Sequence, residues 1–531
     1  MRIADVTLRP EEAFNEVLFP EILYERLGLK KDGSVWVQPV RRSIDARAKK
    51  VIVRFQCEIY DDGEVRPVLG YKQPYPDVKN KEPFIVIGSG PAGLFAALKL
   101  IAMGYKPLVF ERGRDVQSRR RDLAAINKDH IVNPESNYCF GEGGAGTYSD
   151  GKLYTRSKKR GDIRKVLETL VAHGAKQDIL FDAHPHIGTN KLPRLVMELR
   201  QTIVDCGGEV HFNAKVADFV ITRDTMEGVV LSSGEKIMGE GVILATGHSA
   251  RDIFFLLRKK KIAIEAKPFA LGLRVEHSQN LIDKIQYHCA VDRGPYLPAS
   301  SYGLVHQVPL SGRERSVFSF CMCPGGFIVP ASTAPGEVVV NGMSPSRRDS
   351  VFANSGIVVA VDERDFASYG EHGPLAGLWF QADIERMACA LAGGTQRAPA
   401  QRLIDFVEGR VTGHLLPTSY QPGLTSVDMR ELLPDFIHHA LAIAFREFGK
   451  KMKGYYTNDA QVVGVESRTS SPVKIPRDDA TLEHPQIKRL FPCGEGAGYA
   501  GGIVSAAMDG ERSAEAAVNA MTSRKPLGHN K

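Results

Sequence analysis

The glycine-rich segment Gly88-Ser-Gly-Pro-Ala-Gly93 constrains the fold of this chain more than any other feature. It matches the pattern G-x-G-x-x-G, an apolar run at 84–87 precedes it, and an apolar run with helical spacing at 94–103 follows it. In this context the first glycine permits a tight turn, the second lets the backbone approach a pyrophosphate, and the third lets helix pack closely on strand. The start of such a helix also favours phosphate, because its N–H groups are unpaired. The segment therefore predicts a strand–turn–helix unit that binds a dinucleotide.

A second apolar run at 107–111 ends in an acidic residue. Glu111 stands 18 residues after Gly93, close to the spacing of about 20 that is typical of the acid that binds a ribose hydroxyl. Two linked features are harder to match by chance than one. The predicted dinucleotide contacts of this βαβ unit are Gly88, Ser89, Gly90, Pro91, Ala92, Gly93, Glu111 and Arg112.

Two later segments continue the same parallel sheet. Gly241-Val-Ile-Leu-Ala-Thr-Gly247 and Arg489-Leu-Phe-Pro-Cys-Gly494 are both apolar and end in glycine, and the second leads into a helical stretch at 503–521. These spacings and compositions are typical of strands and a helix. The predicted nucleotide-binding fold is therefore discontinuous in the chain.

The remaining segments indicate two further units. The N-terminal region has helical spacing at 11–27 and strand-like runs at 34–38 and 51–55, and a segment rich in proline and charge, 71–83, follows as a connector. Between 263 and 477 we expect strands at 269–275, 317–320 and 337–340 and helices at 382–392 and 435–448. The predicted domains are a small N-terminal α+β domain at 1–80, a nucleotide-binding domain at 84–262 and 478–524, and an inserted α+β substrate or cap domain at 263–477.

Two motifs carry a resemblance to a known family. Phe-Gly-Glu-Gly-Gly-Ala-Gly-Thr at 140–147 and Gly-Glu-Gly-Ala-Gly-Tyr-Ala-Gly-Gly at 494–502 resemble those of uncharacterised FAD-dependent dehydrogenases in the superfamily of two-dinucleotide-binding-domain flavoproteins. The resemblance covers nearly the whole chain. It implies FAD as the cofactor and an α/β fold, in which a Rossmann-like, glutathione-reductase-like FAD-binding domain carries an inserted α+β substrate domain and the small N-terminal α+β domain.

The resemblance also implies roles for single residues. Glu495 would accept hydrogen bonds from the flavin ribityl chain, and the helix that starts at Gly502 and Ile503 would face the pyrimidine edge of the flavin, where the reduced ring carries negative charge. Val216, in a predicted strand at 209–220, would meet the adenine, and the loop 140–151 would lie along the flavin or pyrophosphate. The further expected FAD contacts are Gly143, Gly144, Val216, Thr246, Gly247, Gly494, Glu495, Gly502 and Ile503.

The loop 140–151 also matches G-x-G-x-x-G, through Gly141, Gly143 and Gly146. We do not interpret it as a second dinucleotide fingerprint, because no strand leads into it and 147–151 has the composition of a turn. A single fingerprint argues against a dedicated NAD domain. It leaves open NADH or NADPH as a transient reductant in the substrate cleft.

Candidates for chemistry beside the flavin follow the strand ends. His248, Ser249 and Arg251 come directly after the segment 241–247, and parallel sheets bind ligands at the carboxyl ends of strands. His184, His186 and Arg468 are similar in kind, and each has a structural alternative in local hydrogen bonds. In a strand, Cys321 and Cys323 would have Cα atoms about 6.6 Å apart, near the upper limit for a disulfide, which favours buried inert thiols over a redox pair. The candidate catalytic residues are His248, Arg251, Arg468 and Cys323.

Composition indicates the expected location of the protein and the partners that it is expected to lack. The chain has no apolar run fit to span a membrane and no secretory signal, and its eight scattered cysteines predict neither a disulfide framework nor a metal site. We expect a soluble cytoplasmic protein of unknown oligomeric state. The net charge of +7 is modest for 531 residues, and the basic runs 119–121, 158–160 and 258–261 are interpreted as solvated surface, so that nucleic acid is not an expected partner.

The function that these features favour is an FAD-dependent oxidoreductase, a dehydrogenase that transfers a hydride between flavin N5 and an organic small-molecule substrate. Two alternatives remain at this stage. One is a flavin-dependent RNA-modifying protein, suggested by the basic runs and the N-terminal domain; the other is a non-catalytic FAD-binding redox sensor or partner.

Overall fold

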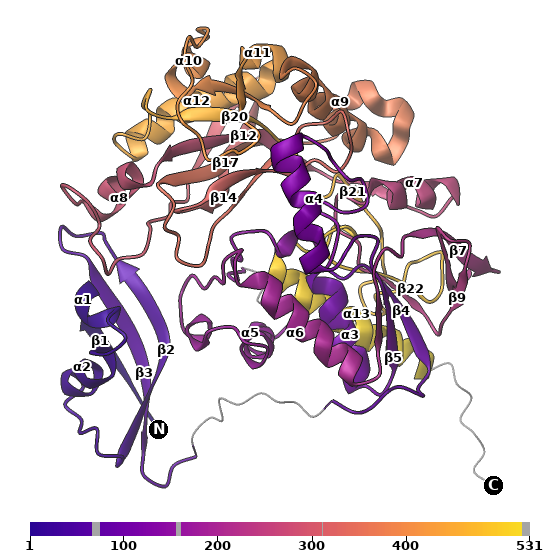
Figure 1. The fold of residues 1–531 in the computed structure, drawn as a ribbon, viewed down its shortest axis with the longest axis horizontal. Helices are drawn as coiled ribbons and strands as arrows, with labels where there is room; N and C mark the ends of the chain where they lie inside the picture. The colour runs from indigo at the N-terminus through magenta and orange to yellow at the C-terminus, as the bar shows by residue number, and fades with distance from the viewer. Residues whose placement is uncertain (66–74, 156–160, 311, 523–531) are drawn as a thin grey trace.

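The computed structural model describes residues 1–65, 75–155, 161–310 and 312–522, and its fold is a mixture of α-helices and β-sheets (Figure 1). The basic run 158–160 and the first four residues of the expected connector, 71–74, lie outside the described residues. Three sheets dominate the fold: one near the N-terminus, one parallel sheet and one large mixed sheet. Within the described residues, no helix is both long and apolar enough to cross a bilayer.

The N-terminal unit is a three-stranded antiparallel sheet with two short helices. The strand order is β1-β3-β2, and the bounds are β1 (Arg2–Leu8), α1 (Pro10–Ala13), α2 (Phe19–Arg26), β2 (Val35–Asp45) and β3 (Ile52–Asp61). The prediction of one helix over 11–27 is wrong, because the chain turns between α1 and α2. There the side chain of Asn15 accepts hydrogen bonds from the backbone of Val17 and Leu18, which competes with helical pairing.

The parallel sheet contains the predicted βαβ unit. Its order is β22-β10-β4-β5-β6, and all neighbouring pairs are parallel. The bounds are β4 (Pro83–Ile87), α3 (Pro91–Ala102), β5 (Lys106–Phe110), β6 (Glu209–His211), β10 (Val242–Leu244), β22 (Leu490–Pro492) and α13 (Ile503–Thr522). The predicted strands at 84–87, 107–111, 241–247 and 489–494 are thus confirmed as neighbours in one sheet, each with shifted ends.

The two faces of this sheet pack against different layers. Phe84 and Val86 face the helices, whereas Ile85 and Ile87 face a second sheet, β7-β8-β9, as the alternation of a buried strand requires. We call the parallel sheet, the β7-β8-β9 sheet and the helices around them the central domain. Its further elements are α4 (Val116–Asp129), η1 (Gly144–Gly146), α5 (Ile163–Ala172), η3 (Gln177–Leu180), α6 (Leu192–Asp205), β7 (Val216–Thr222), β8 (Thr225–Leu231), β9 (Lys236–Met238) and α7 (Arg251–Lys259).

The strand predicted at 209–220 is two strands in different sheets. β6 ends at His211 and β7 begins at Val216. Between them Asn213 adopts a left-handed conformation with φ 53°, which asparagine tolerates better than most residues. The chain therefore turns from the parallel sheet into the β7-β8-β9 layer at this point.

The segment 263–477, which we call the cap, contains a seven-stranded sheet of order β13-β14-β17-β12-β20-β18-β19. The strands of this sheet are β12 (Phe269–Ser278), β13 (Val305–Leu310), β14 (Arg313–Cys323), β17 (Phe352–Val361), β18 (Ala398–Arg402), β19 (Leu424–Ser426) and β20 (Gln461–Glu466). The other elements are β11 (Glu265–Ala266), α8 (Gln279–Tyr287), β15 (Phe327–Pro330), β16 (Val340–Met343), η4 (Ala367–Leu375), α9 (Ala376–Leu391), α10 (Leu403–Glu408), α11 (Met429–Leu432), α12 (Asp435–Lys451) and β21 (Val473–Lys474).

One strand of the cap begins later than predicted. Residues 337–339 are not a strand, and β16 starts at Val340. The carboxylate of Glu337 accepts hydrogen bonds from the backbone N–H groups of Thr333 and Ala334 at 2.6 and 2.9 Å. This side chain closes a turn instead of standing out from a sheet.

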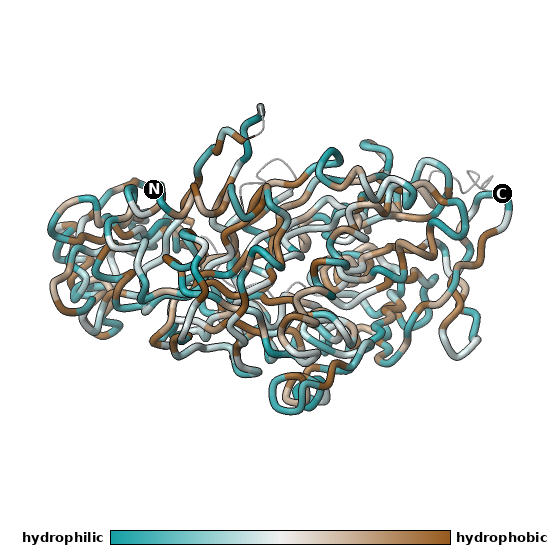
Figure 2. The backbone as a smooth tube through the Cα atoms, turned by 90° about the horizontal axis from the view of Figure 1, so that it is seen from above, coloured by the Kyte–Doolittle hydropathy of each residue, from teal (hydrophilic) through white to brown (hydrophobic). Residues whose placement is uncertain are grey.

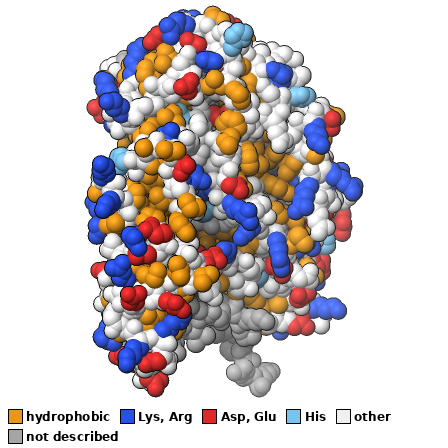
Figure 3. All heavy atoms as spheres, turned by 60° about the vertical axis from the view of Figure 1, so that its left-hand side comes forward, with side chains coloured by type: hydrophobic (Ala, Val, Ile, Leu, Met, Phe, Trp, Pro, Cys, Tyr) orange, Lys and Arg blue, Asp and Glu red, His pale blue; other side chains and the backbone are white. Residues whose placement is uncertain are grey.

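The domains are arranged so that the cap lies over the carboxyl ends of the parallel strands, with α4 rising toward it (Figure 1). Seen from above, the molecule is elongated, with the N-terminus toward one end (Figure 2). The N-terminal unit contacts the central domain through Arg42, whose Nε lies 2.5 Å from Oδ1 of Asp182. Basic and acidic side chains are interspersed on the face that carries the N-terminal unit (Figure 3).

Candidate active site

A cavity of about 410 Å³ runs along the carboxyl ends of β4, β5 and β10 and reaches the cap strands β14 and β16. Open parallel sheets bind ligands at this edge. The predicted glycine segments all converge on the cavity, although they lie far apart in the chain. The sequence-predicted residues that line it are Gly88, Gly90, Pro91, Ala92, Glu111, Arg112, Gly144, Val216, Thr246, Gly247, His248, Cys323, Arg468, Glu495, Gly502 and Ile503.

The turn from β4 into α3 lacks space for a side chain at Gly88 and, most severely, at Gly93. A Cβ on Gly93 would lie 1.9 Å from the carbonyl oxygen of Gly88, so helix and strand approach backbone to backbone. Gly90 differs, because a Cβ there would meet no protein atom within 4 Å and the residue borders the cavity. Gly93 therefore allows the helix to pack closely on the strand, whereas Gly90 leaves space for a ligand.

Glu111 holds the two glycine loops together. Its Oε2 accepts from the backbone N–H and the hydroxyl of Ser89, at 3.0 and 2.9 Å. Its Oε1 accepts from the backbone N–H groups of Gly113 and Gly141, both at 3.0 Å. Four donors match the accepting capacity of a carboxylate. The side chain is only 5% exposed, and its first role in this structure is to order the backbone around the cavity; the expected contact with a ribose stays a prediction.

The loop 140–151 is ordered by a buried cation. Arg119 is fully buried and donates to the backbone carbonyls of Asn137, Glu142 and Gly144 at 2.7, 2.9 and 3.0 Å. The interpretation of the basic run 119–121 as solvated surface is therefore wrong for Arg119. A loop that curls its carbonyls inward needs a donor at its centre, and the guanidinium supplies several in one plane.

One end of the cavity, which we call the Lys215 end, is bordered by Lys215, Val216, Arg112 and Asp252. Arg112 pairs with Glu135 at 2.7 Å and with Asp252 at 2.9 Å. Lys215 pairs with Glu135 at 2.8 Å. The charges at this end are balanced within the protein.

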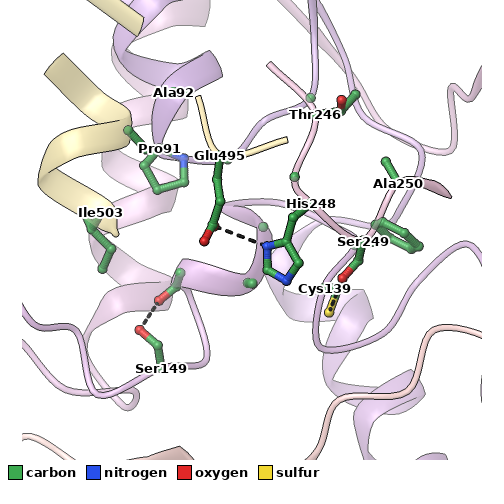
Figure 4. Close-up of a pocket in the computed structure, with 18 of the residues that line it drawn as sticks. Pro91, Ala92, Cys139, Ser149, Thr246, His248, Ser249, Ala250, Glu495 and Ile503 are labelled. Atoms are coloured by element: carbon green, nitrogen blue, oxygen red, sulfur yellow. Dashed lines mark hydrogen bonds and ion pairs between the residues drawn. The ribbon is translucent and has the colours of Figure 1, made fainter. Parts of the chain in front are cut away.

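At the middle of the cavity, His248 and Glu495 point toward each other (Figure 4). The Nδ1 atom of His248 lies 3.3 Å from Oε2 of Glu495. His248 follows β10 and Glu495 follows β22, so the two neighbouring parallel strands deliver the pair. Ile503 and the first turn of α13 lie beside them.

These surroundings fit a dinucleotide with a flavin. The hydroxyl of Thr246 is buried at the cavity and has no hydrogen-bond partner among the described residues. Besides Gly90, a Cβ on Gly247 or Gly502 would meet no protein atom within 4 Å, so backbone is left open to a ligand there. The N-termini of α3 and α13 both border the cavity, and each favours negative charge. The donor set thus matches a pyrophosphate at one helix and a reducible ring at the other.

Arg251 and Arg468 are held in a buried group of four charges. Glu385 lies 2.9 Å from Arg251 and 2.8 Å from Arg468, and Glu337 lies 2.7 Å from Arg468. We call these four residues the ion-pair cluster. It joins α7 of the central domain to α9 of the cap. Because both cations already have carboxylate partners within the protein, neither arginine has an unbalanced charge to offer as an anion clamp.

The other histidine candidates lie away from His248. His186 borders a second cavity, of about 1610 Å³, between Arg42 of the N-terminal unit and the α5–α6 region, and its Nε2 lies 3.2 Å from the carbonyl oxygen of Ser346. His184 packs against the ring of Tyr154 with a centroid distance of 5.4 Å. The structure does not bring either imidazole to the border of the first cavity.

The two cysteines of β14 differ in exposure. Cys323 is 1% exposed, whereas Cys321 is exposed, and both carry free thiols at the cavity border. The expectation of buried thiols is therefore right for Cys323 and wrong for Cys321. β14 bulges between Phe320 and Cys323, and Cys321 has a φ of 42°. A bulge re-aims side chains, which is why simple strand alternation fails here.

We expect the two thiols to differ in reactivity. Burial raises the pKa of both thiols, that of Cys323 to about 12, and only the thiolate attacks alkylating reagents. The two differ in access, because Cys321 is exposed to the reagent and Cys323 is buried. At pH 8, iodoacetamide should modify Cys321 in the native protein, and the rate of alkylation of Cys323 should be at least about 100-fold lower. Peptide mass spectrometry after timed quenching measures both sites, and urea-unfolded protein, in which both should react, is the control. Equal rates in the native protein would contradict the structural assignment and support a reactive pair.

Sequence reasoning missed the far end of the cavity. Lys152, Phe320, Asn341 and Gly342 border it there, together with Cys321. Lys152 directly follows the glycine loop 140–151, and this position could have indicated that it lies near the cavity. The sequence gives no such indication for the cap residues, because their position at the cavity depends on the bulge in β14.

Comparisons with known proteins agree with this site. Residues 268–469 match the family model "FAD-dependent protein, C-terminal domain-like", and residues 1–60 match a domain of unknown function, DUF8436. An uncharacterized protein of Clostridium beijerinckii is 39% identical over 97% of this chain and 98% of its own length. The FAD-dependent monooxygenase notI of an Aspergillus species is 27% identical over 35% of this chain, and the match spans 39% of that protein. The crystal structure of CtdE in complex with FAD and a substrate aligns at 12% identity and a TM-score of 0.30, over 84% of this chain and 82% of that one.

The family match and the fit of the cavity lead to the same cofactor. The matched family is FAD-dependent, and the glycine turns, helix N-termini and unpartnered Thr246 hydroxyl suit that group. FAD is the cofactor of this protein.

Proposed function

The chain belongs to the same family as the uncharacterized Clostridium beijerinckii protein, and from this premise we propose that it is an FAD-dependent oxidoreductase that transfers a hydride between flavin N5 and an organic substrate. One observation carries the proposal. The cavity that borders the glycine turn of α3 continues without interruption to the cap strands β14 and β16. A cofactor and a substrate could therefore meet in one continuous cavity, as hydride transfer requires.

We propose that different residues of the central domain bind different parts of the cofactor, as the sequence motifs predict. The Lys215 end, with Val216, would hold the adenosine part, and the turn at Gly90 would hold the pyrophosphate against the start of α3. Gly494 and Glu495 would hold the ribityl chain. The start of α13, at Gly502 and Ile503, would stabilise negative charge on the reduced ring. Bound FAD supplies the hydride acceptor and donor, and the protein supplies orientation and electrostatics.

His248 is the group best placed to exchange a proton in this scheme. It borders the cavity beside Glu495, with which its Nδ1 lies in contact at 3.3 Å. A carboxylate partner orients the imidazole ring. The Nε2 atom of the ring then remains for a substrate. Ser249 follows at once and is engaged elsewhere, because its hydroxyl donates to the sulfur of Cys139 at 3.5 Å.

An anaerobic absorption experiment tests the proposed function. We expect freshly purified protein to show the visible bands of oxidised flavin, and NADH, NADPH or an organic reductant to bleach them. Readmission of air then separates two reaction types, since a dehydrogenase needs an added acceptor whereas a monooxygenase couples reoxidation to an oxygenated product. Protein that takes up no FAD on reconstitution would refute the proposal. Bound FAD that no reductant reduces would favour a non-catalytic role.

A further inference from the structure

The far end of the cavity, away from the Lys215 end, has a charge that the protein does not neutralise. Lys152 borders the cavity, and among the described residues no carboxylate lies within ion-pair distance of its Nζ. Its ammonium group donates a hydrogen bond to the neutral carbonyl oxygen of Met322. Asp150, two residues earlier, is engaged by Arg348, with Nη2 and Oδ2 2.6 Å apart. The local sum of these three charges is therefore one positive charge.

The other charged residues around the cavity are accounted for. Arg112 and Lys215 face Glu135 and Asp252, and the ion-pair cluster contains two cations and two anions. Glu111 accepts from four donors of the protein, and Glu495 lies beside His248. Among the described residues that border the cavity, Lys152 is thus the cation whose charge is left for a bound ligand to balance.

A bulge in β14 lies at this end of the cavity. Pairing with β17 is shifted between Phe320 and Cys323, so carbonyl groups at the bulge are free for other donors. The buried Arg274 donates to the carbonyl of Cys321 at 2.7 Å from the cap side. Lys152 donates to the carbonyl of Met322 from the side of the central domain. The ammonium group has three protons, and two of them remain.

Asn341 adds a directed donor. Its Oδ1 accepts from Nη1 of Arg274 at 3.3 Å and from the backbone N–H of Gly342 at 2.7 Å. Since both acceptor positions of the amide oxygen are taken, its NH₂ group is what it offers to the cavity that it borders. Arg274 is itself fixed by Glu466 and Asn354. A cation from the central domain and an amide donor from the cap border the same cavity, and together they suit an anionic oxygen group.

We propose that this end of the cavity binds a carboxylate group of the substrate, with Lys152 and Asn341 as its donors and Arg274 as a positioning residue. The inference rests on the proposed function, because it names the substrate class of the same site. Carboxylate oxygens accept from an ammonium and an amide together. Binding there places the carboxylate at the cap, and the carbon next to it toward the middle of the cavity, where His248 and Glu495 lie.

Isothermal titration of the purified holoprotein with matched pairs tests the proposal: benzoate against benzamide, pyruvate against pyruvamide, and succinate against succinamide. Each pair has similar shape and differs in charge. We expect at least one carboxylate to bind, and its amide at least about tenfold more weakly. Lys152→Gln should weaken the carboxylate about tenfold, whereas Lys152→Arg, which keeps the charge, should retain binding. Lys128→Gln, at an exposed lysine of α4, is the matched control.

The outcomes separate this inference from the proposed function. The visible spectrum, recorded first, reports FAD, and the titration reports the anion independently of any turnover. Failure of all three carboxylates to bind, or equal binding by the amides or by Lys152→Gln, overturns the carboxylate site while a flavin spectrum leaves the oxidoreductase standing. Selective binding that depends on Lys152 in protein without flavin would support the anion site and refute the proposed function.

Discussion

Replacing Glu385 by glutamine lowers the free energy of unfolding by about 3–5 kcal/mol, because the exchange leaves two buried guanidinium groups with one carboxylate between them. Glu385 is fully buried and lies within 2.9 Å of both Arg251 and Arg468. A glutamine keeps the shape of the side chain but carries no charge. The loss is large because the cations stay buried after their partner is gone. Since the cluster joins α7 to α9, the substitution should also loosen the cap.

The same cluster predicts a dependence on pH. Burial by itself raises the pKa of Glu385, but the charges of Arg251 and Arg468 outweigh it and lower the pKa to about 2, from an ordinary value of 4.5. A carboxylate whose folded-state pKa is lowered contributes stability that is present above its unfolded value and is lost as pH falls through the folded one. The difference in stability between wild type and Glu385→Gln should therefore hold from pH 7 to about 5 and shrink toward pH 2.

Urea unfolding followed by circular dichroism at several pH values measures both effects. The matched control is Glu363→Gln, at an exposed residue of the same domain, for which we expect a change within about 0.5 kcal/mol. A loss below about 1 kcal/mol for Glu385→Gln would mean that water or a rearranged Glu337 compensates the arginines. A constant difference down to pH 3 would contradict the charge-based explanation.

The ion-pair cluster also marks the limit of what the sequence could predict. The βαβ unit was predictable because its signals are local: apolar runs of strand and helix length around a glycine turn. The cluster brings Arg251 and Arg468 to Glu385 from 134 and 83 positions away in the chain. Arg119 shows the same limit, since a run of three arginines reads as solvated surface until the loop that it orders is known.

The same contrast between local signals and contacts of distant segments applies to the candidate site. The glycine segments and Glu495, which border the cavity, could be predicted because close approach of backbone to a ligand restricts residue type, and that restriction is visible in a sequence. The far end of the cavity was missed because its geometry arises from a bulge in β14 and from Lys152, which meets Met322 across 170 positions. Conversely, Arg251 and Arg468 follow or border the expected region, yet their partners make them structural.

Substituting alanine at two glycines of the same turn should separate packing from cofactor binding. In Gly93→Ala the new Cβ would lie 1.9 Å from the carbonyl oxygen of Gly88, a contact that only a shift of backbone can relieve. Overpacking of this kind costs typically 1–3 kcal/mol or more. We expect Gly93→Ala to lose both stability and FAD.

Gly90→Ala should lose FAD alone. Gly90 has φ −70° and ψ −177°, which alanine adopts without strain, and its Cβ would meet no protein atom within 4 Å. The methyl group would instead enter the cavity where the pyrophosphate is expected to approach the backbone. FAD per protein, read from the visible spectrum after reconstitution, should fall at least about tenfold, while the free energy of unfolding of the FAD-free protein changes by less than about 1 kcal/mol. If Gly90→Ala bound FAD as well as wild type, the pyrophosphate would have to lie elsewhere, and the assignment of the whole cavity would change with it.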